Sequence, residues 1–173
     1  MAKSITEQLR GGDRRSIGAS NRVAGLALKQ PRIFDQLVRA LWDPDPIVRM
    51  RAADAAEKAS ARDANLLVPH KAELLGLLTE ATQPELRWHL AQIAPRLKLT
   101  AAERKRAFSA LQLYLSDRSS IVRTLTLQAL TDVAQQDTSL LPSILDLIRQ
   151  TAKTGTPAMR ARSRKLLRRF EKF

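Results

Sequence analysis

Few side chains in this 173-residue chain are suited to catalysis or metal binding. Trp88 and His89 are adjacent, and Asp54 lies in an alanine-rich segment. The two histidines, His70 and His89, do not form a recognised metal-binding spacing. The chain has no Cys, which excludes thiolate nucleophiles, disulfides and Cys-ligated zinc. It also has no H-E-x-x-H, G-x-S-x-G or glycine-rich phosphate loop, so we expect a non-catalytic protein without metal or cofactor.

Composition favours a helical protein, and the charge of its C-terminal end indicates either a polar capping helix or a cap that also binds an anionic partner. Hydrophobic residues make up 44% of the chain and aromatic residues only 4%, so the core must consist mainly of Leu, Ile, Val and Ala. The net charge is +13, and the stretch from Lys153 to Phe173 has eight basic residues against one acidic residue. No stretch approaches the roughly 20 apolar residues of a membrane span. We expect a cytoplasmic protein.

Arginines recur at a nearly constant spacing. Arg49, Arg87, Arg123 and Arg160 are separated by 38, 36 and 37 residues, and each follows a helix-start signal and precedes apolar residues at helical spacing. A period of this length with two helices in each period is typical of an α-solenoid.

The start signals place the helices of each pair. Asp45 can cap a helix that begins at Pro46, and Thr100 with Glu103 forms an S/T-x-x-E capping box. The predicted pairs are 31–41 with 46–60, 67–80 with 84–97, 101–115 with 119–135, and 140–153 with 157–172. We expect a capping helix over 16–29 and a flexible arm over 1–15.

The segments "DPDPIVRMRAADAAEKA" and "DRSSIVRTLTLQAL" resemble HEAT repeats, in which an Asp-containing turn and a Val-Arg pair introduce the second helix. The other two units keep Arg87 and Arg160 but have no Asp in the preceding turn. The resemblance covers residues 31–173. It implies an all-α, right-handed α-α superhelix of about four HEAT-like pairs, with repeats over 31–63, 64–100, 101–137 and 138–173. Together with the capping helix they form one domain over 16–173.

The resemblance also implies roles for individual residues. The recurrent arginines are expected to form a structural ladder in which turn carboxylates accept their hydrogen bonds. That ladder consists of Arg49, Arg87, Arg123 and Arg160 with Asp45 and Asp117. Second helices normally face the concave side, which predicts outward-facing partner contacts at Arg51, Asp54, Lys58, Trp88, His89, Gln92, Arg96 and Gln128. A basic patch for an anionic partner is predicted at Arg162, Lys165, Arg168, Arg169 and Lys172.

These observations favour a scaffold that binds a protein or peptide on its concave face. The alternative is a nucleic-acid-binding protein that contacts phosphates through the basic C-terminal helix and Arg104, Lys105 and Arg106. A further alternative is a DNA glycosylase, because HEAT-like alkylpurine glycosylases use a basic concave face with aromatic residues and an aspartate, for which Asp54 is the candidate.

Overall fold

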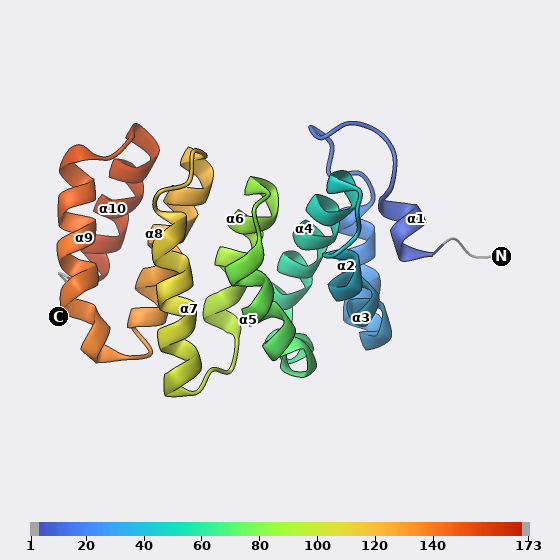
Figure 1. Ribbon diagram of the computed structural model, residues 1–173, viewed down its shortest axis with the longest axis horizontal. Coiled ribbons are helices and arrows are strands. Elements are labelled where there is room, and N and C mark those ends of the chain that lie inside the picture. Colours follow the sequence, from blue (N-terminus) through green and yellow to red (C-terminus); the bar gives the residue numbers. More distant parts are fainter. Residues whose placement is uncertain (1–3, 171–173) are drawn as a thin grey trace. The chain divides into compact units, whose positions relative to one another are not determined.

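A computed structural model describes residues 4–170, which are all-helical and contain no strand. The contacts divide the chain into two compact units, Met1–Lys98 and Leu99–Phe173, called here the N-terminal and C-terminal units. Figure 1 labels their helices in chain order. No helix within residues 4–170 is long and apolar enough to span a membrane.

The N-terminal unit contains six α-helices and two 3-10 helices within its described residues. The elements are α1 (Ile5–Leu9), α2 (Ser20–Lys29), α3 (Pro31–Ala40), α4 (Pro46–Arg62), η1 (Ala64–His70), α5 (Lys71–Glu80), α6 (Pro84–Ile93) and η2 (Ala94–Arg96). Helices α3 and α4 form one pair and α5 and α6 the next, with the second helices α4 and α6 packed against each other.

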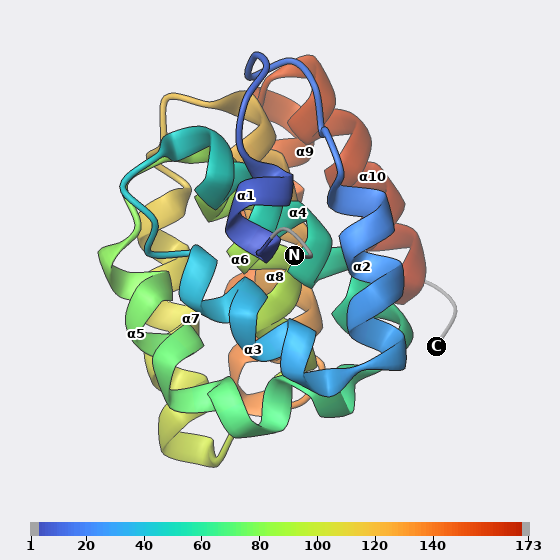
Figure 2. The ribbon, with the colours of Figure 1, turned by 90° about the vertical axis from the view of Figure 1, so that its right-hand side faces the viewer.

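Helix α4 is the central element of this unit. It packs against α1, α2, α3, η1 and α6, and Figure 2 shows α1, α2 and α3 together with α4. Its alanines allow this close packing, because each is at most 1% exposed; they are Ala52, Ala53, Ala55, Ala56 and Ala59. Alanine is also the best intrinsic helix former, so α4 remains helical although it buries few large side chains.

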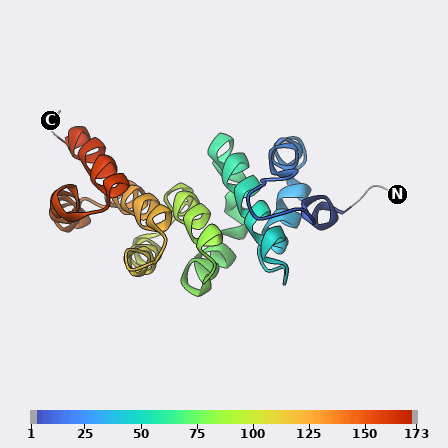
Figure 3. The same ribbon diagram turned by 90° about the horizontal axis from the view of Figure 1, so that it is seen from above.

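The C-terminal unit repeats the same arrangement. Its elements are α7 (Ala101–Tyr114), α8 (Ser120–Ala134), η3 (Thr138–Leu140), α9 (Leu141–Thr154) and α10 (Pro157–Phe170). Helix α8 packs against α7, and α10 packs against both α9 and α8, so α8 and α10 are the second helices of this unit. Figure 3 shows α9 and α10 side by side.

The helix starts follow the predicted capping chemistry. The Asp45 carboxylate accepts a hydrogen bond from the Ile47 amide at 2.8 Å. Thr100 and Glu103 form the predicted capping box, with the Glu103 carboxylate accepting from the Thr100 amide at 2.7 Å. Ser119 caps α8 by accepting from the Val122 amide. A second capping box, formed by Ser4 and Glu7 at the start of α1, was not among the sequence predictions.

The N-terminal segment differs from the predicted arm. Residues 5–9 form α1, whose Ile5 and Leu9 are buried against α3 and α4. The predicted helix over 16–29 begins only at Ser20, because Gly18 has a φ of +53° that an α-helix cannot accommodate. Residues 10–18 therefore form a loop that connects two packed helices. Residues 1–3 lie outside the described part of the chain.

Gly155 forms the tight turn between α9 and α10, and a larger residue there must destabilise the C-terminal unit. A Cβ at this position would lie 2.7 Å from the Thr151 carbonyl oxygen. We expect Gly155→Ala to reduce the free energy of unfolding by about 1–3 kcal/mol. The matched control is Gly76→Ala, because nothing lies within 4 Å of a Cβ added in α5. Calorimetry should show a lower melting temperature for the first variant and an equal or higher one for the control.

Candidate functional site

Arg51 fixes the N-terminal loop onto α4. Its side chain was predicted to face outward, but it is only 3% exposed. The guanidinium donates to four backbone carbonyls: Leu9 at 2.7 Å, Gly11, Ser16 at 3.0 Å and Asp13 at 3.2 Å. Gly18 lies against the same group, since a Cβ there would be 2.8 Å from the arginine Cζ. Arg51 therefore holds a turn-containing loop by its backbone.

Asp54 is also buried, one turn further along α4, with 8% of its surface exposed. Its Oδ2 lies 2.6 Å from the Lys58 Nζ, which also donates to the Asn21 side chain at 2.7 Å. Its Oδ1 lies 3.9 Å from the His89 Nε2. Lys58 therefore neutralises this carboxylate and links α4 to α2.

His89 lies on α6 beside this ion pair and is 9% exposed. Burial lowers the pKa of His89 below its usual 6.5, against the opposing influence of Asp54, Glu57 and Glu85 and with a smaller contribution from Lys58. Its Nδ1 is buried and has no hydrogen-bond partner among the described residues. At neutral pH the imidazole is therefore uncharged.

A cavity of about 280 Å³ lies between the N-terminal loop and the second helices α4 and α6. Glu85 and Trp88 of α6 line it together with Arg14 of the loop, and the Arg14 guanidinium donates to the Glu85 Oε1 at 2.9 Å. The loop is thus attached to both second helices of this unit.

The remaining predicted contacts of the N-terminal unit are half-buried. Arg96 donates to Glu57 at 2.6 Å and to Ser60 at 3.1 Å, and Gln92 donates to the Trp88 carbonyl at 3.3 Å. The prediction of an outward-facing column is wrong for Arg51, Asp54 and His89. The reason is that the loop over residues 10–18 covers the face on which they lie.

In the C-terminal unit, the predicted residues of α8 and α10 meet on one face. Arg162 donates to the Gln128 Oε1 at 3.2 Å, and Arg169 lies 2.9 Å from an Asp132 carboxylate oxygen. Lys165 and Arg168 are exposed and have no side-chain partner within residues 4–170. Lys172 lies outside the described residues. Of the four described residues of the predicted basic patch, Arg162 and Arg169 contact α8, and Lys165 and Arg168 are exposed.

An apolar groove of about 210 Å³ lies on the α8 and α10 face. Ile121, Thr124 and Leu125 of α8 form it with Ser120 and Ala158, and Ile121 is 53% exposed. No segment within the described part of the C-terminal unit covers this groove. We call the groove and the adjoining residues Arg162, Lys165 and Arg169 the α8/α10 face.

The ladder arginines differ from one another in their hydrogen bonds. Arg49 donates to the Gln83 Oε1 at 2.9 Å and to the carbonyls of Asp43 and Pro44. The acceptor is therefore an amide of the following turn, while Asp45 serves as the cap of α4. Arg87 donates to the Ala81 carbonyl at 2.7 Å.

Asp117 and Arg160 are further members of the predicted ladder. Asp117 is buried and accepts from the Ser119 amide at 2.8 Å. Arg160 is exposed and has no side-chain partner within residues 4–170.

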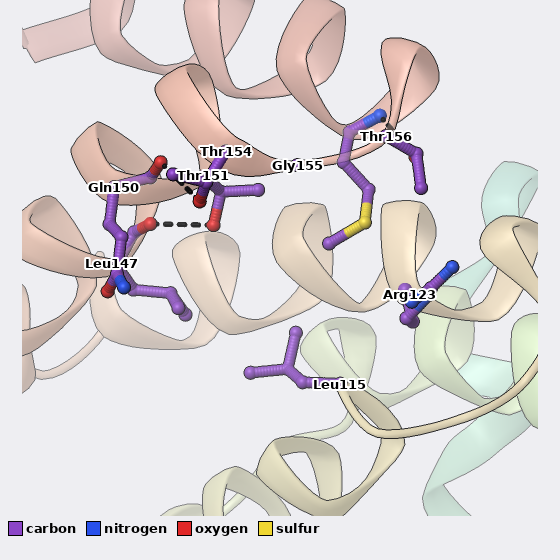
Figure 4. A pocket seen from close by; sticks show the side chains of 9 residues that line it. Leu115, Arg123, Leu147, Gln150, Thr151, Thr154, Gly155 and Thr156 are labelled. Atoms are coloured by element: carbon purple, nitrogen blue, oxygen red, sulfur yellow. Dashed lines mark hydrogen bonds between the residues drawn. The ribbon is translucent and has the colours of Figure 1, made fainter.

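Arg123 borders a cavity of about 350 Å³ in the C-terminal unit. Figure 4 shows it across the cavity from Gln150 and Thr151, with Leu115 also at the cavity wall. The Arg123 Nε is buried and has no hydrogen-bond partner among the described residues.

Comparison with protein-family models and with curated proteins found no match. Within residues 4–170, no group of three or more His, Asp or Glu side chains is arranged to hold a metal ion.

Replacing Arg51 should release the N-terminal loop. Arg51→Met removes four hydrogen bonds from a charged donor, and we expect the free energy of unfolding to fall by about 2–4 kcal/mol. Limited trypsin digestion should cut faster after Arg14 and Arg15. Arg22→Met is the control, because Arg22 is exposed and has no side-chain partner within residues 4–170. Equal digestion of both variants would contradict this role for Arg51.

His89 should make the N-terminal unit less stable in mild acid. Because its folded-state pKa lies below 6.5, the unfolded chain binds the proton more readily. The stability due to neutral His89 is therefore complete above about pH 7.5 and is lost as the pH falls through 6.5 towards the folded-state value. Denaturant melts at about pH 7.5 and 5.5 should show a larger loss for the wild type than for His89→Gln. An identical loss in both would show that the pKa of His89 does not differ between the folded and unfolded states.

Proposed function

We propose that this protein is a non-catalytic, HEAT-like helical repeat scaffold that binds an acidic segment of a partner protein on its α8/α10 face. The observation behind the proposal is a contrast between two equivalent faces. In the N-terminal unit, the chain's own residues 10–18 cover the face of the second helices. In the C-terminal unit, no segment within residues 99–170 covers the corresponding groove.

The covered face supports a peptide as the occupant of the open one. Arg51 recognises residues 9–16 through their carbonyl oxygens, and Arg14 of the same segment binds Glu85 on the helix below. Backbone carbonyls and one charged side chain are the groups by which this polypeptide loop is held on the second helices. The second helices of this fold are thus compatible with binding polypeptide.

The open face combines an apolar groove with positive charge. Ala158 and Lys165 are seven residues apart on α10, which corresponds to about 10 Å along the helix axis. An extended peptide covers that distance in about three residues. Side chains alternate between the two faces of an extended peptide, so an acidic residue two or four positions after the apolar one points to the same side, about 7 or 13 Å further on, where the Lys165 side chain can meet it.

The charge of the C-terminal unit adds to this preference. Residues 99–173 include 14 basic and six acidic residues, a net charge of +8. Such an excess attracts an acidic partner at long range and increases its association rate.

The HEAT-like superhelix is part of the proposal. Its support is the pairing of helices within each unit and the packing of the second helices against each other. In addition, Arg49 donates a hydrogen bond to Gln83 in the turn before the next second helix. The handedness and the continuity of a solenoid across the two units remain predictions.

The alternative functions have less support. Exposed cations on α10 without partners within residues 4–170 are compatible with nucleic-acid binding, but the adjacent apolar groove has no use in phosphate recognition. Asp54 lines the cavity of about 280 Å³, but catalysis by it, as the glycosylase hypothesis requires, has less support because the Lys58 Nζ lies 2.6 Å from its carboxylate.

Binding of a labelled peptide tests the proposal. The peptide GSFSSEEEG has an aromatic anchor four residues before its second glutamate, and we expect saturable binding to the full-length chain by fluorescence anisotropy. Lys165→Glu should weaken binding by about tenfold or more, since it reverses the charge next to the acidic residues. Arg160→Glu, which changes the net charge equally but lies roughly 140° around α10, should weaken it only slightly.

Two further measurements separate the alternatives. Replacing the peptide's phenylalanine by alanine should reduce binding to the wild type, and Ala158→Trp, which fills the groove, should abolish that difference. A labelled DNA duplex serves as the polyanion control. Tighter binding of the duplex than of the peptide, weakened equally by both charge reversals, would contradict the proposal in favour of nucleic-acid binding.

A further inference from the structure

Arg49 and Arg123 occupy equivalent positions in their helices but have different surroundings. Each is the fourth residue of its second helix, counted from Pro46 in α4 and from Ser120 in α8. Arg49 has a side-chain acceptor in the next turn, the Gln83 Oε1 at 2.9 Å. Arg123 has no side-chain hydrogen-bond partner within residues 4–170.

The difference arises from one residue in the following turn. Gln83 directly precedes Pro84, and Thr156 directly precedes Pro157. Gln83 makes two contacts: its Nε2 donates to the carbonyl of Pro46, and its Oε1 accepts from Arg49. The Thr156 hydroxyl bonds instead to the Ser120 Oγ at 3.0 Å, a side-chain contact to the residue that is equivalent in position to Pro46. Thr156 is too short to supply an acceptor to the arginine as well.

A cavity lies where that acceptor is missing. The cavity of about 350 Å³ is within the size range of small-molecule sites. Gly155 contributes no side chain to fill it, and the hydroxyls of Thr151 and Thr154 are turned back onto the carbonyls of Leu147 and Gln150, as Figure 4 shows. Those hydroxyls donate within α9 and do not neutralise the arginine.

The lining specifies the chemistry of a ligand. A guanidinium binds a carboxylate with two parallel hydrogen bonds, and the amide of Gln150 lies across the cavity. Leu115, Leu147 and Met159 provide apolar walls. A compact aliphatic group with one carboxylate matches both parts of the lining.

We propose that the cavity beside Arg123 binds a carboxylate attached to a small aliphatic group, which accepts hydrogen bonds from the Arg123 guanidinium. This group is either a free aliphatic acid or the C-terminal residue of a peptide. The site is separate from the α8/α10 face and does not depend on the proposed peptide-binding function.

The test is an amide chemical-shift titration of the full-length ¹⁵N-labelled chain. Two ligand pairs serve as probes: 4-methylpentanoate with 4-methylpentanamide, and acetyl-Ala-Leu with its C-terminal amide. We expect saturable shifts at the amides of Gly155 and Thr156 with at least one of the two carboxylates, and binding at least about tenfold weaker for its amide. Binding of 4-methylpentanoate alone identifies a free acid as the ligand, and binding of acetyl-Ala-Leu alone identifies a chain end.

Variants distinguish the site from general attraction by a basic protein. Arg123→Met should abolish binding, whereas Arg118→Met removes an equal charge from an exposed neighbour and should have little effect. Thr156→Gln places the missing acceptor beside Arg123 and should also abolish binding while it leaves the arginine in place. This second variant keeps the test decisive if Arg123→Met does not fold. The proposal is overturned if neither carboxylate saturates, if the amides bind equally, or if Thr156→Gln binds as the wild type does.

Discussion

The enclosure of α4 is the constraint on which the N-terminal unit depends. Five other elements pack around this helix, and the alanines at its contacts are almost completely inaccessible. A helix surrounded in this way cannot use large side chains on every face, because neighbouring helix axes lie only about 8–10 Å apart. Small residues therefore determine the packing distance, and the positions of α2, α3 and α6 follow from it.

The same enclosure explains the unexpected burial of charge. With neighbours on most sides, α4 has little surface left for Arg51 and Asp54, and a buried charge is costly unless it is paired. Asp54 obtains Lys58, whereas Arg51 has no acidic partner and uses four carbonyls of the N-terminal loop. The loop is thus a structural requirement of α4, because its carbonyls are the acceptors that permit Arg51 to be buried.

The sequence predicted the helices better than their exposed faces. Prolines, the cap at Asp45 and the capping box at Thr100 are local signals, and they located the starts of α3, α4, α6 and α7 correctly. The helix predicted over 67–80 begins only at Lys71, because Pro69 lies inside η1. Exposure is a property of long-range packing. Arg51 was predicted to face solvent, because nothing in its own helix indicates that a loop 35 residues earlier in the chain packs on it. That loop contains Gly11 and Gly12, which were interpreted as part of a flexible arm. Gln83 was likewise missed as the partner of Arg49, since a carboxylate rather than an amide was expected there.

The exposure of the basic residues on α10 agrees better with the sequence prediction, because α10 packs against α9 and α8 and keeps a free face. On α10 the predicted basic residues Arg162, Lys165, Arg168 and Arg169 all reach the surface or bond to α8 at its edge.

The comparison of Gln83 with Thr156 shows that one residue decides whether the arginine of a second helix has a side-chain acceptor in the next turn. A side chain that is two atoms shorter still bonds to the first residue of the second helix, through the Ser120 hydroxyl in place of a backbone carbonyl, but supplies no acceptor to the arginine. A repeat can therefore gain or lose a binding position at this turn without changing its packing, because the helix pair is held by the core while the arginine responds to a single residue.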